Sequence, residues 1–459
     1  MGNATFSICV IGGGFTGVAS AIACLERVRG PFRLHVVEPG ASLGRGVAFG
    51  AHHPLNLLNI RARDLSIHAG KPGDFLSWAF RQLDQGENDA SLHESLAHTF
   101  LPRQFFGEYV RQRFSETVEQ RGDVELKIIR AVATACSVYQ NRFLIRLDQA
   151  SPVSADVLIL ATAYGVQKQS HLAALAPYDG VPNDLFAGAS SMMLIGSGLT
   201  MVDVLLGARR EGFAGKATVV SRGGQLPRPH APKGVVPQDI QVPPFRRLSS
   251  LTAAVRIACE TAEAHGSPWQ GVMNGLRASL QSIWRSLPIE DQARFLRHLR
   301  PYWDAHRHRV PLEVHEQVQR EFSSGKATLL RGRVINVERR ADEFRVTLRR
   351  SASQTHETLE THLAFDCTGH SPDLSSPLLQ SLMAQGLACT DPHRLGLLVR
   401  PDGQVLARDS AVTPRLFAMG PLCQGSLWEI TAVPEIVRQA DGAATSIAAL
   451  RKPAELLVD

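Results

Sequence analysis

Two glycine-rich turns hold the residues with the clearest chemical meaning in this sequence. The first turn contains Gly12, Gly14 and Gly17, and the second contains Gly196 and Gly198. Glycines at this spacing let the backbone turn sharply and approach a pyrophosphate at the N-terminus of a helix. Both turns therefore predict a dinucleotide site.

The first turn lies in the context that this interpretation requires. A predicted strand at 6–11 precedes it, an Ala-rich helix follows it, and a second predicted strand at 34–37 ends in Glu38. A carboxylate there can accept hydrogen bonds from a ribose. We expect FAD at this turn, whereas the alternative is a glycine-rich turn with an incidental acid. The predicted binding residues are Gly12, Gly14, Phe15, Thr16, Gly17 and Glu38.

The second turn repeats the first with one change. Arg222 follows Gly196 at the same spacing of 26 residues at which Glu38 follows Gly12. An arginine at this position can pair with a 2′-phosphate, so the residues predict NADPH. Met201 replaces the third glycine, which leaves open a degenerate, empty fold. The predicted binding residues are Gly196, Gly198, Leu199, Thr200, Ser221 and Arg222.

The elements that must position these turns also occur twice. Alternating β-rich runs follow each turn, and we interpret both sets as strand meanders that end in a buried strand and a small-residue turn. The runs lie at 124–130, 131–139, 142–148 and 155–163, and at 327–330, 334–339, 344–349 and 363–369. Gly369, at the end of the second set, is a further predicted cofactor-binding residue.

The fold class that these elements predict is α/β, with two Rossmann-like dinucleotide-binding domains, β-meanders and a helical insertion. Residues 1–165 and 366–459 are expected to form the FAD domain, and 166–365 the NADPH domain. Apolar residues at helical spacing place the insertion at about 245–325, with its aromatic residues in a core.

Composition excludes several other classes of protein. With 44% hydrophobic and 20% charged residues the chain is typical of a globular protein, and its net charge of +6 comes from scattered basic residues. We therefore expect no nucleic acid partner. The seven cysteines form no CxxC pair and no zinc spacing, so neither a redox dithiol nor a metal is expected. Without a long apolar stretch, a cytoplasmic protein with no membrane segment is expected.

Taken together, the motifs resemble those of flavoproteins with two dinucleotide-binding domains. Within that fold they resemble a bacterial FAD/NAD(P)-binding family related to the flavin-dependent N-hydroxylating monooxygenases. The resemblance covers nearly the whole chain. Besides the two turns, it rests on residues 44–49, 53–59, 101–107, 221–223, 226–230, 302–309 and 427–435.

The resemblance implies further site residues. Arg45, Asn59 and Arg103 are expected near the flavin, and Gly420 closes the FAD site. The usual Gly-Asp pair is here Gly420 followed by proline, so we expect the backbone and the following helix to hold FAD. The turn at 161–163 ends in alanine where such proteins have glycine, which we expect to matter little because alanine is nearly as small.

Two residues are candidates for a catalytic role. Asn59 can donate a hydrogen bond to a flavin or a substrate, and the alternative is a loop amide that satisfies backbone groups. His308 lies in a basic run, 306–309, that can recognise a carboxylate or the NADPH phosphates. The alternative for this run is an exposed basic helix end.

The function that the resemblance implies is an FAD-dependent, NADPH-using oxidoreductase of the N-hydroxylating monooxygenase type. Its partner would be a small amine or an amino-acid-like substrate. A first alternative is an NADPH-dependent flavin reductase or dehydrogenase that passes electrons to a small molecule or a partner protein. A second alternative is a non-catalytic nucleotide-binding protein, which the substitutions at Met201 and Pro421 make conceivable.

Overall fold

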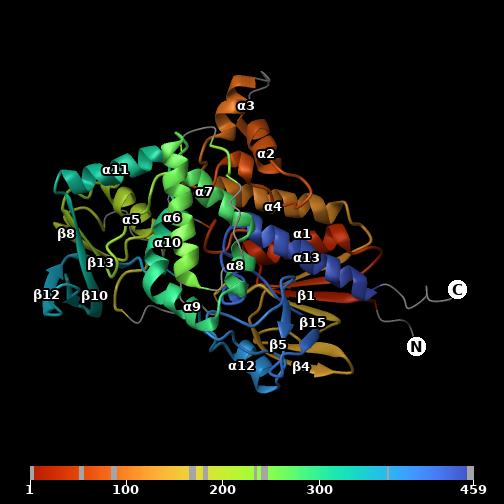
Figure 1. Ribbon diagram of the computed structural model, residues 1–459. Coiled ribbons are helices and arrows are strands. Elements are labelled where there is room, and N and C mark those ends of the chain that lie inside the picture. Colours follow the sequence, from red (N-terminus) through yellow and green to blue (C-terminus); the bar gives the residue numbers. More distant parts are fainter. Residues whose placement is uncertain are drawn as a thin grey trace. The chain divides into compact units, whose positions relative to one another are not determined.

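The computed structural model describes residues 5–50, 56–83, 90–164, 172–178, 185–231, 235–238, 247–369 and 372–451. The chain divides into two compact units (Figure 1). The first unit is Met1–Gln167 with Ser371–Asp459, and the second is Lys168–His370. Gly369 therefore falls in the second unit, whereas the predicted boundary at 366 placed it in the first.

The first unit is built on a six-stranded sheet in the order β14-β15-β7-β1-β2-β3. All neighbours pair in parallel except β14 and β15, which are antiparallel. The strands are β1 (Ser7–Ile11), β2 (Arg33–Val37), β3 (Glu125–Ile129), β7 (Val157–Leu160), β14 (Gln404–Leu406) and β15 (Val412–Ala418).

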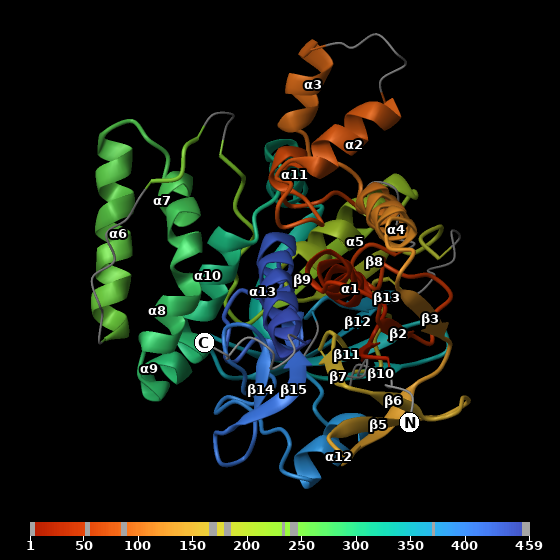
Figure 2. The ribbon, with the colours of Figure 1, turned by 90° about the vertical axis from the view of Figure 1, so that its right-hand side faces the viewer.

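Both faces of this sheet are buried, because the side chains of alternate residues along a strand pack into two different hydrophobic cores. Ile8 and Val10 of β1 contribute to the core beneath helix α1 (Phe15–Arg27), which lies beside α13 (Val433–Arg451; Figure 2). Cys9 and Ile11 contribute to the core on the opposite face. This continuous burial explains the unbroken apolar runs from which the strands were predicted.

The remaining elements of the first unit cover the two faces of the sheet. A three-stranded antiparallel sheet and α12 belong to one core, and between β2 and β3 in the chain the described residues form four helical segments. These elements are β4 (Ala133–Tyr139), β5 (Arg142–Leu147), β6 (Val153–Ala155), α12 (Pro377–Ala384), η1 (Ala62–Asp64), α2 (Asp74–Leu83), α3 (Ala90–Ala97), α4 (Arg103–Glu119) and η4 (Gly420–Cys423).

The second unit has a six-stranded sheet in the order β12-β11-β10-β9-β8-β13. Strands β13, β8, β9 and β10 run parallel, while β11 and β12 continue the sheet antiparallel. The strands are β8 (Ser191–Ile195), β9 (Lys216–Ser221), β10 (Ala327–Arg339), β11 (Phe344–Arg350), β12 (His356–Thr361) and β13 (Leu363–Asp366).

Helices of the second unit follow β8 and β9. Helix α5 (Leu199–Arg210) packs on the sheet core, and the segment between β9 and β10 is helical, with Trp284 buried. Its elements are α6 (Leu248–Ala264), α7 (Gln270–Gly275), η2 (Leu276–Ala278), α8 (Leu280–Ser286), α9 (Ile289–Arg294), η3 (Phe295–Leu299), α10 (Arg300–Arg307) and α11 (Leu312–Ser323).

The predicted meanders need two corrections. The run at 124–130 forms β3, which pairs in parallel with β2 in the main sheet and is not part of a meander. The runs at 327–330 and 334–339 form one strand, β10, which pairs with β9 in its first part and with β11 in its second. The partner changes between Arg331 and Gly332, and a register shift between Val334 and Asn336 lies within the pairing with β11.

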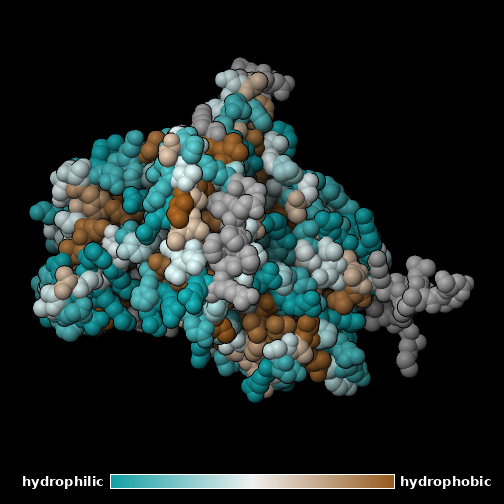
Figure 3. Space-filling model, viewed as in Figure 1, coloured by the Kyte–Doolittle hydropathy of each residue, from teal (hydrophilic) through white to brown (hydrophobic). Residues whose placement is uncertain are grey.

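The surface in Figure 3 carries more hydrophilic than apolar side chains. Among the described residues, no helix combines the length and the apolar composition needed to cross a membrane.

Two helical glycines give a matched prediction of stability. An added Cβ at Gly442 in α13 would meet no atom within 4 Å, so Gly442→Ala should raise the free energy of unfolding by about 1 kcal/mol through helix propensity. At Gly107 in α4 a Cβ would lie 2.6 Å from the Phe49 carbonyl oxygen, so Gly107→Ala should lower it by about 2 kcal/mol. Urea unfolding of both variants measures the difference, and equal effects would contradict this packing.

Candidate nucleotide-binding sites

The first glycine turn has a geometry that only glycines allow. Gly12 has a φ of +102°, and a Cβ there would lie 2.4 Å from the Ala161 carbonyl oxygen. A Cβ at Gly17 would lie 1.8 Å from the carbonyl oxygen of Gly12. The start of α1 is therefore pressed directly against the end of β1, as the spacing predicted.

A second loop approaches the same turn. The Gly44 amide donates to the Gly13 carbonyl oxygen at 2.8 Å, and a Cβ at Gly14 would lie 3.4 Å from the Gly46 Cα. The first amides of a helix have no acceptor within the helix, and no side chain among the described residues caps the start of α1. Two facing glycine backbones at an uncapped helix N-terminus fit the pyrophosphate of a dinucleotide.

Hydrogen bonds from the backbone hold the carboxylate of Glu38, the predicted ribose-binding residue, beside the first glycine turn. One carboxylate oxygen accepts from the Gly13 amide at 2.6 Å, and the other accepts from the Gly40 amide at 2.8 Å. An ionised carboxylate has about four acceptor positions, so each oxygen keeps one for a ribose hydroxyl.

Three motifs of the resemblance meet at the first residue of α1. The Phe15 ring packs against Phe49 at 5.4 Å and against Phe106 at 5.9 Å between ring centroids, and Phe49 and Phe106 are 4.8 Å apart. Phe15 and Thr16 are both buried. The Phe15 side chain thus belongs to the core, which leaves its backbone for a cofactor.

The side chains of Arg45 and Arg103, both predicted to lie near the flavin, have contacts within the first unit. The Arg45 Nε is buried without a hydrogen-bond partner among the described residues, and its Nη2 lies 3.8 Å from Glu108. An unsatisfied buried donor fits a ligand acceptor at this loop. The Arg103 Nε donates to the Leu57 carbonyl oxygen at 3.1 Å and thereby fixes the segment that leads to Asn59. Residues 53–55 of that motif lie outside the described residues.

The turn at Gly420 and Pro421 uses its backbone groups within the protein. The Gly420 amide donates to the Gln439 side chain at 2.8 Å, and Pro421 has no amide hydrogen. Neither residue therefore offers a backbone donor to a ligand, and holding of FAD by the backbone and the following helix stays a prediction. A Cβ at Gly420 would lie 2.8 Å from the Thr16 Oγ1, so the turn does approach the start of α1.

The alanine at the end of the turn after β7 differs from our expectation. Ala163 has a φ of +54°, in the left-handed region that favours glycine, and its counterpart Gly369 has a φ of +79°. We had expected alanine to be tolerated because it is nearly as small as glycine. The substitution matters instead because this position has a left-handed backbone conformation.

The second glycine turn repeats the geometry of the first. Gly196 has a φ of +109°, and a Cβ there would lie 2.4 Å from the Cys367 carbonyl oxygen, just as Gly12 meets Ala161. Gly198 has no atom within 4 Å of an added Cβ. Met201 is fully buried in the core of the unit. The third glycine is thus replaced by a core side chain while the turn keeps its shape.

The end of β9 presents the predicted cation. The Ser221 Oγ accepts from the Gly224 amide at 3.0 Å and shapes the loop that carries Arg222. Arg222 is exposed and makes no hydrogen bond or ion pair within the described part of the chain.

Two residues of the basic run at 306–309 have contacts within the second unit. Arg309 is buried, donates to the Asn274 side chain at 2.5 Å and lies 5.9 Å from the Trp269 ring centroid. His308 is half-exposed at the end of α10, with its Nε2 3.9 Å from Asp304. His308 and Asn59 lie in different units, and a catalytic role for either stays a prediction.

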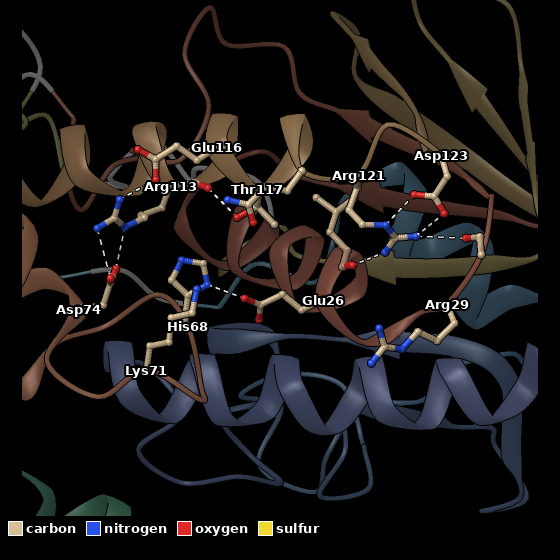
Figure 4. A pocket seen from close by; sticks show the side chains of 13 residues that line it. Glu26, Arg29, His68, Lys71, Asp74, Arg113, Glu116, Thr117, Arg121 and Asp123 are labelled. Atoms are coloured by element: carbon tan, nitrogen blue, oxygen red, sulfur yellow. Dashed lines mark hydrogen bonds and ion pairs between the residues drawn. The ribbon is translucent and has the colours of Figure 1, made fainter.

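A cavity of about 560 Å³ lies in the first unit, away from the glycine turn of that unit. Leu25 and Glu26 line it at the C-terminal end of α1, whereas the glycine turn is at the N-terminal end of the same helix. Charged side chains line most of it (Figure 4). Sequence reasoning missed this cavity, because its residues come from α1, α4, the segments that follow these two helices, the loop before α2 and the first residue of α2, and share no motif.

A hydrogen-bond network forms one wall of this cavity. Arg113 donates to Asp74 at 2.7 Å and to Glu116 at 2.6 Å, and the Tyr109 hydroxyl donates to Asp74 at 2.8 Å (Figure 4 shows the arginine between its two acids). His68 is buried and contacts Glu26 at 2.7 Å. Among the described residues, no group of three or more side chains is arranged to hold a metal ion.

This network makes stability depend on pH. Burial alone would raise the pKa of Asp74, but the bonds from Arg113 and Tyr109 outweigh it and lower the pKa below its usual value. The network therefore stabilises the fold above the unfolded pKa of about 3.9, and this contribution is lost as the pH falls through the folded pKa.

Arg113→Met should test this prediction. The variant should lose about 2 kcal/mol at pH 7 and lose less than the natural chain on further acidification. Urea unfolding at a series of pH values measures both effects. Arg33→Met is the matched control, because its ion pair with Glu125 is exposed and should contribute less than about 1 kcal/mol. Parallel pH profiles for Arg113→Met and the natural chain would contradict the prediction.

The fold and the turns define a class of protein. Residues 9–165 match a family model described as FAD-NAD(P)-binding. The two-sheet architecture is that of flavoproteins with two dinucleotide-binding domains, which confirms the predicted fold class and, for this part of the chain, the predicted resemblance.

Solved structures that share the fold include two ornithine hydroxylases and a cadaverine monooxygenase. The ornithine N-hydroxylase of Kutzneria sp. 744 is 15% identical, with a TM-score of 0.63 over 98% of this chain and all of its own. The ornithine hydroxylase of Pseudomonas aeruginosa is 14% identical, with a TM-score of 0.64 over the same shares. The FAD-bound cadaverine monooxygenase of Erwinia amylovora is 10% identical, with a TM-score of 0.65 over 100% of this chain and 98% of its own. No curated protein matches the sequence.

Proposed function

We propose that this protein is an FAD-dependent monooxygenase that uses NADPH and oxygen to hydroxylate the nitrogen of a small amine or amino-acid-like substrate. The observation that carries the proposal is the repeated turn. Gly12 against Ala161 and Gly196 against Cys367 have the same geometry, and one turn leads to Glu38 and the other to Arg222. One chain thus has two dinucleotide sites, one suited to a free ribose and one to a 2′-phosphate.

The structural similarity supports the type of reaction. The Kutzneria structure is described as a complex of an ornithine N-hydroxylase with reduced FAD, NADP⁺ and L-ornithine. The Erwinia enzyme is described as a cadaverine monooxygenase. When bound, FAD and NADPH supply the redox chemistry. In the balanced reaction, an amine, oxygen, NADPH and a proton give a hydroxylamine, water and NADP⁺.

The residues of this chain bind and orient the two cofactors in this proposal. Glu38 accepts hydrogen bonds from the ribose of FAD, and the uncapped start of α1 holds its pyrophosphate. Arg222 holds the 2′-phosphate of NADPH. The Arg45 Nε, which is buried without a partner among the described residues, donates to FAD.

One observation favours a reductase as the second candidate. The thioredoxin reductase of Lactococcus lactis shares the fold, at 12% identity and a TM-score of 0.52. A redox dithiol of the CxxC type is absent from this sequence, so electrons would have to pass to a different acceptor.

Product analysis separates these candidates. The FAD-loaded protein is supplied with NADPH, oxygen and a panel of ornithine, lysine and cadaverine, and hydroxylamine and hydrogen peroxide are quantified against NADPH consumed. A monooxygenase should form hydroxylamine with at least one amine, in proportion to NADPH. NADPH consumption that gives hydrogen peroxide with every amine would favour the reductase.

A further inference from the structure

A second arginine lies beside Arg222 at the carboxyl end of the parallel strands. In the register of β9 and β10, Arg331 pairs with Ser221, the residue before Arg222. Neighbouring strands are about 4.8 Å apart, so both arginines leave the backbone at the same edge of the sheet. Nothing in the spacing of the glycine turn indicated Arg331, because the helical segment separates it from β9 in the chain.

The Arg331 side chain covers the loop that carries Arg222. A Cβ added at Gly224 would lie 2.7 Å from the Arg331 Cγ, 2.9 Å from its Cδ and 3.4 Å from its Nε. Gly224 also has a φ of +62°. The stem of Arg331 therefore packs directly on this loop, and the loop has its shape because Gly224 leaves room for the arginine.

Neither cation is neutralised by the protein. Both side chains are exposed, and within the described residues neither makes an ion pair or a hydrogen bond through its guanidinium group. Arg333, two residues further along the same strand, is exposed and unpaired in the same sense. Two adjacent unpaired guanidinium groups repel one another, whereas a phosphate between them accepts hydrogen bonds from both.

We infer that Arg331 and Arg222 form a two-armed clamp for the 2′-phosphate of NADPH, and that Arg331 is a determinant of specificity for NADPH over NADH. This inference rests on the proposed function, since it assumes that NADPH binds at the second turn. It adds a residue from β10 to the 2′-phosphate contact that the sequence indicated at Arg222.

Binding of two nucleotide fragments tests the clamp. Adenosine 2′,5′-bisphosphate carries the 2′-phosphate and adenosine 5′-monophosphate lacks it, so the ratio of their affinities isolates the contribution of that phosphate. Calorimetry on the FAD-loaded full chain should show Arg331→Gln weakening the bisphosphate about 10-fold or more, with the monophosphate changed less than about twofold. The matched control is Arg333→Gln, which changes the net charge equally and should weaken the bisphosphate less than about twofold.

A double substitution adds a second readout. If both arginines hold one phosphate, the effects of Arg222→Gln and Arg331→Gln on bisphosphate affinity should not add in the double variant. Equal affinities for Arg331→Gln and Arg333→Gln would overturn the clamp while leaving the proposed function intact. A natural chain that binds neither fragment and is not reduced by NADPH would overturn the proposed function, and the clamp with it.

Discussion

Replacing Gly17 with alanine is expected to abolish FAD retention and to destabilise the first unit by at least about 3 kcal/mol. The added Cβ would lie 1.8 Å from the Gly12 carbonyl oxygen, which belongs to rigid backbone and cannot move aside as a side chain can. Helix α1 would have to shift away from β1, and its first amides would move away from the pyrophosphate. FAD content after purification and the free energy of unfolding measure the two effects.

Gly122→Ala is the control for this experiment. Gly122 lies in the same unit, and a Cβ there meets no atom within 4 Å. This variant should keep the FAD content and the stability of the natural chain. A Gly17→Ala protein that still retains stoichiometric FAD would contradict the role that we give to the close contact between helix and strand.

Replacing Arg222 with glutamine is expected to raise the KM for NADPH about 100-fold while the KM for NADH changes less than about threefold. Charge-assisted hydrogen bonds of this kind contribute about 1.5–3 kcal/mol, which gives the expected size of the effect. Arg222 is exposed and unpaired among the described residues, so its loss should not disturb the fold. Steady-state kinetics with both nucleotides measures the change.

Arg210→Gln serves as the control for the kinetic experiment, because it removes one charge in the last turn of α5, outside the proposed clamp. It should leave both KM values within about twofold of those of the natural chain. Equal losses with NADPH and NADH for Arg222→Gln would show that the arginine supports the fold or the adenosine and does not read the 2′-phosphate.

The local parts of the fold could be predicted from the sequence. Each glycine turn is specified within one short segment, because Gly12 and Gly196 both have a positive φ and both lie against a backbone carbonyl oxygen. The same holds for the residues at the ends of β2 and β9, whose chemistry follows from their position in the unit. The second turn also shows that Met201 is compatible with this geometry, because its side chain packs in the core.

The pairing of strands could not be predicted from the same patterns. The run that forms β3 resembles the runs of the meander in composition, and only its parallel register with β2 distinguishes it. The long strand β10 appears in the sequence as two short runs, because Arg331, Gly332 and Arg333 separate its two apolar parts. A local pattern reports the conformation of a segment and not its partner.

Contacts between distant segments were missed for the same reason. Gln439 on α13 accepts a hydrogen bond from the Gly420 amide. Arg331 packs on the loop after β9, although the whole helical segment separates the two in the sequence. Ala163 adopts a left-handed backbone that its residue type does not favour. A backbone conformation that the residue type does not favour can be recognised only when the structure of the turn is known.

The measurement that tests the central claim most directly is anaerobic reduction of the FAD-loaded protein, followed by the absorbance of the oxidised flavin. We predict that NADPH bleaches this absorbance stoichiometrically, and that NADH does so much more slowly at equal concentration. The claim that one chain binds both dinucleotides for electron transfer would be contradicted by a protein that retains FAD but whose flavin stays oxidised with both nucleotides.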